Sequence, residues 1–453
     1  MVIGEAMDTL LARQQAYFKT QETKSYAFRI ETLKTLKAVI KKYEKDILNA
    51  LYLDLHKSEM EAYSTEVGYV YHSIDFLIKH LKKYMRVRKV KTPLFMLNTK
   101  SYQVFEPLGS VLIIGPYNYP FQLVIEPLIG AIAAGNTAIL KASEFVENTD
   151  LILKKIITEA FDPSYIAFVR GDYKTNEVLI NMPFDHIFFT GSTKVGKIVY
   201  EAAAKNLVPV TLELGGKSPV IICKDANLKV AARRIVFGKF TNAGQTCIAP
   251  DYIYVDQTIK TDFTNALVEA IDTMYSDIHA FGKVLDRHQA RINRLIDPDK
   301  VLYTGKAKEN EIPPILLHNV TFDDHVMQEE IFGPLLPILT FESVNEVIST
   351  LLDKEKPLAL YLFTNDKQVI KRIFTTVSFG GGAINDTLMH VANPYLPFGG
   401  IGASGIGHYH GFYSFQTFSK LKSFIKKGTF LDPSIAYPPY TPFKQKLIKF
   451  FLK

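Results

Sequence analysis

The stretch from Ser110 to Ala142 constrains the fold more than any other part of the chain. Only Glu126 and Lys141 are charged within it, so we expect most of it to be buried. A membrane-spanning helix needs about 20 continuous apolar residues, and Gly and Pro pairs interrupt this stretch. Strands covered on both faces of a sheet appear as short apolar runs. The stretch therefore predicts a buried strand over 111–114, a buried helix over 121–134 and a second strand over 137–141.

Short apolar runs continue along the chain and alternate with amphipathic helices. Residues 1–85 instead carry apolar side chains at helical spacing, and 86–103 suggest an extended, hairpin-like excursion. Further strands are expected near 166–170, 186–190, 208–214, 219–223, 252–255, 335–339 and 358–363. Repeated strand–helix–strand units predict an α/β fold with doubly wound parallel sheets. The Gly-rich segments 380–382 and 396–407 are expected to be loops, and 415–425 is expected to be an exposed strand.

Composition excludes several classes of protein. The chain has 453 residues, 47% of them hydrophobic, which suits two or three folded domains rather than a disordered chain. Two cysteines cannot form a disulfide framework, and the N-terminal residues lack the pattern of a secretory signal. We therefore expect a cytoplasmic protein. No zinc-finger or RNA-binding motif is found, so nucleic acid is not an expected partner.

The net charge of +7 arises from the C-terminal segment. From residue 420 onward Asp432 is the only acid in the sequence, against Lys420, Lys422, Lys426, Lys427, Lys444, Lys446, Lys449 and Lys453. On a helix, an apolar face would be formed by Phe443, Leu447, Ile448 and Phe451. Such a helix could lie in a membrane interface and be attracted by anionic lipid. It could equally pack on the enzyme or on a second subunit, and the sequence leaves both interpretations open.

The two cysteines differ in their surroundings. Cys223 ends an apolar run, which is typical of a buried structural cysteine. Cys247 follows the polar and small residues of 240–246, FTNAGQT, which indicate a loop that a ligand can approach. Loop amides can stabilise a thiolate, so Cys247 is a candidate nucleophile.

A single glutamate, Glu213, lies between two leucines just before the pair Gly215-Gly216. Burying a carboxylate is costly unless the group is paired or used. One interpretation is an ion pair with Lys217. The other is a carboxylate of raised pKa that acts as a general base. The residues alone do not decide between them.

A glycine-containing turn, Gly191 to Gly196, follows the strand expected at 186–190. Glycines at a strand-to-helix turn allow a pyrophosphate to approach the helix N-terminus. The turn lacks the complete G-x-G-x-x-G spacing, so a plain strand–turn–helix is the alternative.

Together these segments resemble the aldehyde dehydrogenase superfamily from about residue 20 to residue 425. Residues 212–219 (LELGGKSP) resemble the glutamate signature of that family, and 240–249 (FTNAGQTCIA) resemble its cysteine signature. Further blocks in the family's order are GPYNYP at 115–120, EEIFGP at 329–334 and PFGG at 397–400. The short N-terminus, CIAPDY at 247–252 and YPPY at 437–440 make the chain most similar to class 3 enzymes, which include fatty and aromatic aldehyde dehydrogenases.

The resemblance implies a catalytic role for three residues. Cys247 would attack the aldehyde carbon and form a thiohemiacetal. Asn118 would hold the developing oxyanion, together with the backbone amide of Cys247. After hydride transfer leaves a thioester, Glu213 would activate the water that releases the acid.

The resemblance also implies a dinucleotide site. The adenosine ribose would be held by Lys141 and Glu144, the pyrophosphate by Gly191, Ser192 and Gly196, and the nicotinamide ribose by Glu330 and Phe332. A carboxylate at Glu144 favours NAD, although Lys141 could tolerate the 2′-phosphate of NADP. Substrate contacts are expected from Tyr117, Tyr119, Thr387 and Leu388, with ordinary loop packing as the alternative. No metal site is expected.

The family resemblance implies three domains and a basic tail. We expect an NAD(P)-binding domain at 1–82 and 104–208, a catalytic domain at 209–405, a bridging β element at 83–103 and 406–430, and the tail at 431–453. A homodimer is expected from the class 3 relatives. The predicted function is the NAD(P)-dependent oxidation of a fatty, aromatic or other apolar aldehyde. The alternatives are a thiol esterase that needs no cofactor and a non-catalytic scaffold of the same fold.

Overall fold

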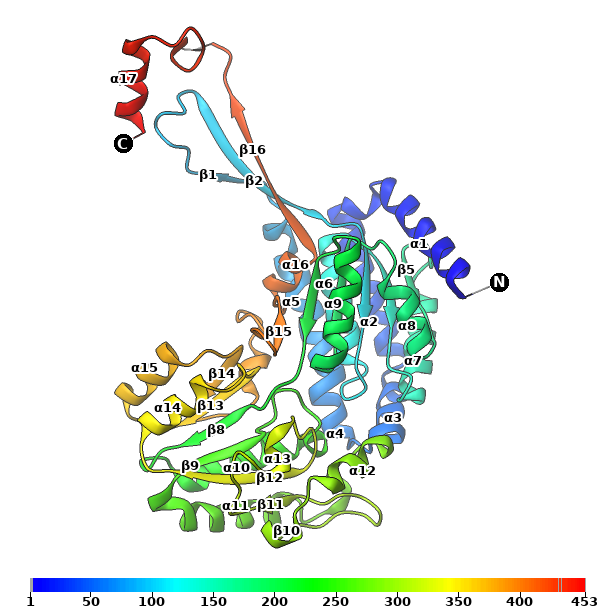
Figure 1. The fold of residues 1–453 in the computed structure, drawn as a ribbon. Coiled ribbons are helices and arrows are strands. Elements are labelled where there is room, and N and C mark those ends of the chain that lie inside the picture. Colours follow the sequence, from blue (N-terminus) through cyan, green and yellow to red (C-terminus); the bar gives the residue numbers. More distant parts are fainter. Residues whose placement is uncertain (1–2, 431, 433, 453) are drawn as a thin grey trace.

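A six-stranded sheet organises one half of the protein (Figure 1). The computed structural model describes residues 3–430, 432 and 434–452. The strands of this sheet are parallel except for the last, which is antiparallel to its neighbour. In spatial order they are β5 (Ile166–Phe168), β4 (Thr137–Lys141), β3 (Ser110–Ile114), β6 (His186–Thr190), β7 (Val210–Glu213) and β15 (Gly405–Ile406).

Helices cover both faces of this sheet, because alternate residues of each strand point to opposite sides. Leu112 and Ile114 of β3 belong to one buried cluster with α1, α8 and α9, whereas Val111 and Ile113 belong to the larger cluster with α2, α5, α6 and α7. These helices are α1 (Ile3–Lys19), α2 (Tyr26–Lys42), α5 (Gly68–Tyr84), α6 (Gln122–Ala134), α7 (Glu147–Ala160), α8 (Tyr173–Ile180) and α9 (Thr193–Lys205). The α/β fold with a doubly wound sheet is thereby confirmed.

A seven-stranded sheet forms the other half, and its strands are parallel except for β10. In spatial order they are β10 (Val301–Thr304), β11 (Ile315–Leu317), β12 (Leu335–Phe341), β9 (Tyr252–Asp256), β8 (Pro219–Ile222), β13 (Ala359–Phe363) and β14 (Gly381–Ile384). Its main helices are α10 (Leu228–Phe240), α11 (Lys260–Met274), α14 (Val344–Leu352) and α15 (Lys367–Thr376).

The prediction that 380–382 form a loop is wrong, because β14 begins at Gly381. A Cβ atom on Gly382 would lie 2.2 Å from the carbonyl oxygen of Leu360 in β13. The glycines are therefore required by close backbone packing within the sheet, and not by a turn.

The chain passes from one sheet to the other between Glu213, the last residue of β7, and Pro219, the first residue of β8. Strand β7 lies beyond the domain boundary predicted after residue 208, yet it pairs with β6 of the six-stranded sheet. The segment with Gly215, Gly216 and Lys217 therefore lies at the junction of the two halves.

A long arm projects from the body and consists of three antiparallel strands, β1 (Arg88–Val90), β2 (Thr99–Pro107) and β16 (Ser419–Lys427) (Figure 1). The strand predicted over 415–425 is only partly correct. Helix α16 (Phe412–Thr417) comes first, and Phe415 within it is fully buried. The exposed strand begins at Ser419 and presents Leu421, Phe424 and Ile425 to solvent.

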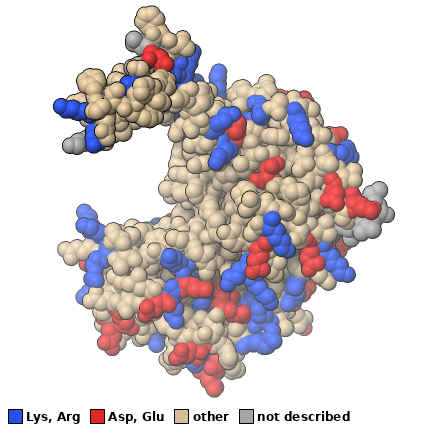
Figure 2. Space-filling model, turned by 45° about the horizontal axis from the view of Figure 1, so that its top comes forward, with Lys and Arg blue, Asp and Glu red and all other residues tan. Residues whose placement is uncertain are grey.

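Beyond the arm lies α17 (Pro442–Phe451), and Figure 2 shows the arm and this helix standing clear of the body, with basic side chains on them. The exposed fractions of Phe443 and Phe450 are 71% and 75%. Lys453, part of the predicted basic tail, is outside the described residues. Among the residues that the structure describes, no helix combines the length and the apolar character needed to cross a membrane.

Candidate active site

The loop after β3 holds Asn118 against the loop that carries Cys247. Asn118 is 3% exposed, and its Nδ2 donates a hydrogen bond of 2.9 Å to the carbonyl oxygen of Gln245. The hydroxyls of Tyr119 and Thr246 share a second hydrogen bond of 2.7 Å. The structure therefore brings Asn118 beside the segment directly before Cys247, and its role as an oxyanion donor stays a prediction.

The cysteine loop has an unusual backbone that other groups hold in place. Asn242, Ala243 and Gly244 all have positive φ, of 54°, 52° and 78°. Left-handed conformations of non-glycine residues cost energy and persist only where the surroundings enforce them. Here the side chain of Gln245 donates to the carbonyl oxygen of Lys283 at 2.9 Å and accepts from the N–H of Leu285 at 2.9 Å.

The far side of the loop is held by Tyr361, whose hydroxyl donates to the carbonyl oxygen of Ile248 at 2.7 Å. Ile248 follows Cys247 directly, and Cys247 as a residue is partly exposed, although burial of its thiol is sufficient to raise the pKa of that group. The backbone of the loop is thus fixed on both sides of Cys247. Cys223, by contrast, is buried at the end of β8.

Glu213 occupies the end of β7 and is only 2% exposed. Neither of its carboxylate oxygens has a hydrogen-bond partner among the described residues, and burial raises its pKa well above the ordinary value. The alternative of an ion pair with Lys217 is wrong. Lys217 pairs with Asp251 instead and donates to the carbonyl oxygens of Glu329 at 2.7 Å and Val326 at 3.0 Å.

Glu330 lies in the segment that Lys217 and Asp251 hold. The N–H of Ile331 donates to Asp251 Oδ1 at 3.0 Å, and Arg291 donates to the carbonyl oxygen of Ile331 at 2.6 Å. Burial, and then the charge of Asp251, raise the pKa of Glu330 to about 8. The Glu330 carboxylate can therefore exchange a proton near neutral pH.

The carboxylates of Glu330 and Glu213 both affect the pKa of the Cys247 thiol. Burial raises the pKa of this thiol, and the charges of Glu330 and then Glu213 raise it further. The backbone N–H groups of Cys247 and Ile248 oppose this effect, because they stabilise the thiolate. A thiol, two carboxylates of raised pKa and a buried amide donor therefore converge on one loop.

Four of the residues predicted to bind a dinucleotide, Lys141, Glu144, Gly191 and Ser192, lie at or just after the ends of β4 and β6, where open α/β sheets bind their ligands. Of the others, Gly196 lies within α9, and Glu330 and Phe332 precede β12. Lys141 ends β4 and forms an ion pair of 2.7 Å with Glu144. Gly191 follows β6, and Ser192 caps the N-terminus of α9. The N–H of Gly191 donates to the carbonyl oxygen of Glu213 at 3.0 Å, so this turn is directly joined to the end of β7.

The chemistry of these groups fits a dinucleotide. The N-terminus of α9 suits a pyrophosphate, and a carboxylate at Glu144 suits ribose hydroxyls. A Cβ atom on Gly196 would lie 2.5 Å from Leu214, so this glycine lets α9 lie close to the segment after Glu213. Phe332, with φ 48°, lies edge-on to Tyr117 at 6.0 Å between ring centroids.

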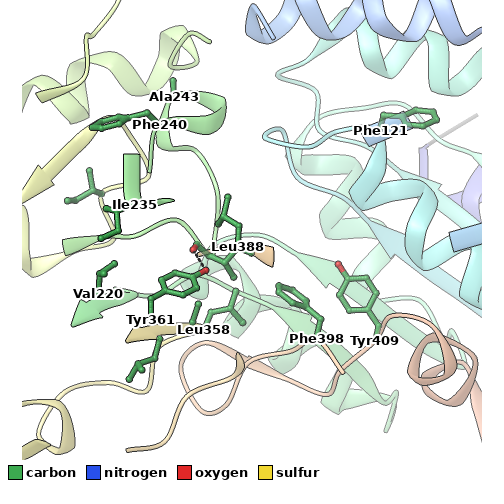
Figure 3. Close-up of a cluster of buried hydrophobic side chains, with 14 of the residues drawn as sticks. Phe121, Val220, Ile235, Phe240, Ala243, Leu358, Tyr361, Leu388, Phe398 and Tyr409 are labelled. Carbon is green, nitrogen blue, oxygen red and sulfur yellow. Dashed lines mark hydrogen bonds between the residues drawn. The ribbon is translucent and has the colours of Figure 1, made fainter. Parts of the chain in front are cut away.

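The four residues predicted to contact substrate have protein partners in this structure, and their substrate role stays a prediction. Tyr117 stacks on His288 at 5.0 Å, and Tyr119, 9% exposed, lies beneath the Lys57 ammonium. Thr387 is 1% exposed and its hydroxyl donates to the carbonyl oxygen of Arg234 at 2.6 Å. Leu388 belongs to the same buried cluster as Tyr361 and Phe398 (Figure 3).

Several residues that shape the site were not singled out from the sequence. Asn242 and Gln245 belong to the segment that resembles the cysteine signature, and the available signal was that both are polar amides close to Cys247. Asp251 follows the same signature, but nothing in the sequence pairs it with Lys217. Among the described residues, no group of three or more His, Cys, Asp or Glu side chains could hold a metal ion.

Comparison with known proteins agrees with this geometry. The profile named "Aldehyde dehydrogenase family" matches residues 4–424. The chain is 52% identical to 4,4′-diaponeurosporen-aldehyde dehydrogenase of Staphylococcus aureus, with 97% of each chain covered. It is 43% identical to aldehyde dehydrogenase family 3 member A2 of Rattus norvegicus, with 98% of this chain and 94% of the relative covered.

A solved structure described as the substrate-bound state of Staphylococcus aureus AldH superposes with a TM-score of 0.96. The two sequences are 51% identical, and the match covers 99% of each chain. The match extends over the projecting arm as well as both sheets, because almost no part of either chain is left out. The chain therefore belongs to the aldehyde dehydrogenase family and is most similar to its class 3 enzymes.

Proposed function

We propose that this aldehyde dehydrogenase uses NAD to oxidise apolar aldehydes, fatty or aromatic, to carboxylic acids through a thioester on Cys247. The observation that carries the proposal is the convergence of Glu213, Glu330 and Asn118 on the loop of Cys247. A non-catalytic scaffold has no need for such a set, because an unpaired carboxylate buried at Glu213 costs stability.

In the first step the Cys247 thiol gives its proton to a neighbouring carboxylate, and the thiolate attacks the aldehyde carbon. A carbon–sulfur bond forms, and the former carbonyl oxygen takes the negative charge. Asn118 Nδ2 donates one hydrogen to Gln245, which leaves its second hydrogen for this oxygen. A preorganised donor of this kind contributes about 2.7–4 kcal/mol to the stability of the transition state.

The bound dinucleotide supplies the acceptor for the hydride that leaves the substrate carbon. Lys141, Glu144 and the N-terminus of α9 would hold its adenosine and pyrophosphate, and Glu330 and Phe332 its nicotinamide ribose. We favour NAD over NADP because the Glu144 carboxylate would bond ribose hydroxyls and repel a 2′-phosphate. Lys141, which pairs with Glu144, would reduce that repulsion, so NADP remains the alternative.

Release of the acid requires water, and Glu213 has the properties of the base that activates it. Its carboxylate is buried, has a raised pKa and has no partner among the described residues that would hold it away from a water molecule. Glu213 takes a proton from the water, the hydroxide attacks the thioester carbon, and the carbon–sulfur bond breaks. A coenzyme A-dependent relative would have no use for this base.

The substrate class rests on the apolar character of the predicted lining, Tyr117, Tyr119 and Leu388, and on the relatives. The Staphylococcus aureus relative is named for 4,4′-diaponeurosporen-aldehyde, so that aldehyde belongs among the substrates tested. We also propose a homodimer, since the arm exposes Leu421, Phe424 and Ile425 on one edge strand. Sedimentation at several protein concentrations would test the dimer.

The decisive experiment follows NADH formation with decanal, benzaldehyde and 4,4′-diaponeurosporen-aldehyde. Cys247→Ala should abolish it, and Cys223→Ala, the matched control, should leave it intact because Cys223 is a buried residue that directly follows β8. Ester hydrolysis without formation of NADH from NAD or of NADPH from NADP, with any of the aldehydes, would favour a thiol esterase. Full activity in Cys247→Ala would exclude the proposed mechanism.

A further inference from the structure

A completely buried ion pair lies behind the oxyanion donor. Lys57 and Glu66 are both 0% exposed, and Lys57 Nζ is 2.5 Å from Glu66 Oε1. Lys57 follows α3 (Glu44–Leu55), and Glu66 lies in η2 (Tyr63–Val67), a single π-helical turn. Such turns are rare and are often found at functional sites. Replacing a buried ion pair by apolar residues is often neutral or stabilising, so stability alone does not explain this pair.

Lys57 contacts the Asn118 loop in two ways. Its ammonium donates to the carbonyl oxygen of Asn118 at 2.9 Å and lies 3.9 Å from the ring centroid of Tyr119. Tyr119 in turn shares its hydroxyl with Thr246 in the cysteine loop. Lys57 is therefore linked to both loops of the proposed oxyanion site.

Glu66 fixes the other end of the same loop. Its Oε2 accepts hydrogen bonds from the backbone N–H groups of Phe121 at 2.9 Å and Gln122 at 3.1 Å. These amides precede and begin α6, which starts at Gln122. The ion pair thus bridges the loop, since one charge holds residue 118 and the other holds residues 121 and 122.

A third group completes the arrangement around Asn118. Its carbonyl oxygen also accepts from Asn242 Nδ2 at 2.8 Å, and the N–H of Asn242 donates to Glu61 Oε1 at 2.8 Å. The segment that contains Lys57, Glu61 and Glu66 therefore contacts the Asn118 loop and the cysteine loop at once. These hydrogen bonds fix the orientation of the Asn118 carbonyl group, and the bond from Nδ2 to Gln245 fixes its side-chain amide.

We propose that Lys57 and Glu66 are positioning residues of the oxyanion site, which act through Asn118 and do not touch the substrate. The inference rests on the proposed function, in which Asn118 stabilises the oxyanion. Misplacing a preorganised donor by about 1 Å costs up to 10²-fold in rate, so the fixed loop has a direct catalytic consequence.

The test is the double variant Lys57→Met/Glu66→Gln, which removes both charges together and leaves neither one buried and unpaired. We expect kcat to fall by about 10-fold or more while the Kd for NADH, measured by fluorescence, is unchanged. The matched control is Lys300→Met/Asp324→Asn, which neutralises an ion pair that contacts neither loop. This control should retain the wild-type kcat.

A mutant cycle separates positioning from a general loss of structure. In an Asn118→Ala background the double substitution should cause no further fall in kcat, because the donor it positions is absent. An equal loss with and without Asn118 would overturn the proposal, and so would a wild-type kcat in the double variant. If the double variant does not fold, the single variant Glu66→Asp replaces it. Aspartate keeps the negative charge but is too short to reach the N–H groups of Phe121 and Gln122 equally well. We expect Glu66→Asp to lower kcat several-fold when Asn118 is present and to have no effect on kcat in the Asn118→Ala background.

Hydrolysis of p-nitrophenyl acetate is measured in parallel, because it uses the same thiol and oxyanion donor but no dinucleotide. If wild-type protein hydrolyses this ester but oxidises no aldehyde, the proposed function fails while the role of Lys57 and Glu66 can still be read from the ester rates. If aldehyde oxidation is robust and the variants do not affect it, only the positioning inference fails.

Discussion

The carboxylate of Glu330 lies directly against the backbone of Gly215, where a Cβ atom would be 1.9 Å from Glu330 Oε2. Gly215 comes two residues after Glu213, so the segment that leaves β7 brings both carboxylates close to Cys247. Gly215 does not have a left-handed backbone; its role is to leave space for a carboxylate. This contact makes the position of Glu330 sensitive to a single added methyl group.

Gly215→Ala should displace Glu330 without unfolding the protein, because the displaced atoms are the end of a flexible side chain. We expect the KM for NAD to rise and kcat to fall, each by about 10-fold, as an oriented group is lost. Steady-state kinetics and NADH fluorescence give these values. Gly216→Ala is the matched control, since its Cβ atom would meet its nearest neighbour, Leu358 N, at 3.4 Å, an ordinary contact. Equal effects of the two substitutions would show that Glu330 is not the affected group.

Glu330→Gln should shift the pH dependence of Cys247 alkylation. The pKa of Glu330 is raised to about 8, so its negative charge appears above that pH, where it raises the pKa of the thiol. Removing this charge should lower the pKa of the thiol, and the alkylation rate with iodoacetamide should therefore rise at lower pH than in wild type. Cys247→Ala gives the background from Cys223. Slower alkylation at every pH would instead identify Glu330 as the base that takes the thiol proton.

Glu213→Gln should separate thioester formation from its hydrolysis. The first turnover should still yield about one NADH per subunit in a stopped-flow burst, whereas the steady-state rate should fall about 10²-fold or more, as expected for loss of a general base. The substitution removes a buried carboxylate without partners among the described residues, so the melting temperature should stay the same or rise. A burst that disappears would place Glu213 before hydride transfer.

Local patterns predicted the sheets well, because each buried strand is a short apolar run. The strands at 137–141 and 186–190 match β4 and β6 from end to end. The prediction failed at Gly381, where glycine serves close packing within a sheet, a condition that is set by the neighbouring strand β13. It also failed over 415–417, where tertiary packing of Phe415 selects a helix.

The residues of the site also fall into those that local sequence patterns could identify and those that they could not. The signatures that contain Glu213 and Cys247 are continuous in sequence, and the sequence could therefore identify them. The ion pair of Lys217 with Asp251 depends on a contact between distant segments. The sequence alone therefore left Glu213 open as an ion-pair partner of Lys217. Lys57 and Glu66 lie in a segment rich in charged residues, which looks like a solvated surface until the fold buries it.

We predict that the C-terminal tail binds anionic membranes, so that removal of residues 431–453 abolishes this binding and leaves the oxidation of a short, soluble aldehyde unchanged. Helix α17 has no acidic residue, and most of the surface of Phe443 and Phe450 is exposed. Each lysine near an anionic surface contributes about 1 kcal/mol, so Lys444, Lys446 and Lys449 together favour the bound state by on the order of 100-fold. Co-sedimentation with phosphatidylglycerol vesicles measures the fraction of protein bound to the membrane. Replacing the three lysines by Gln is the matched control, because it removes the charge and keeps the apolar residues of the helix. Equal sedimentation of the full-length and shortened proteins would mean that the tail serves a contact with protein instead.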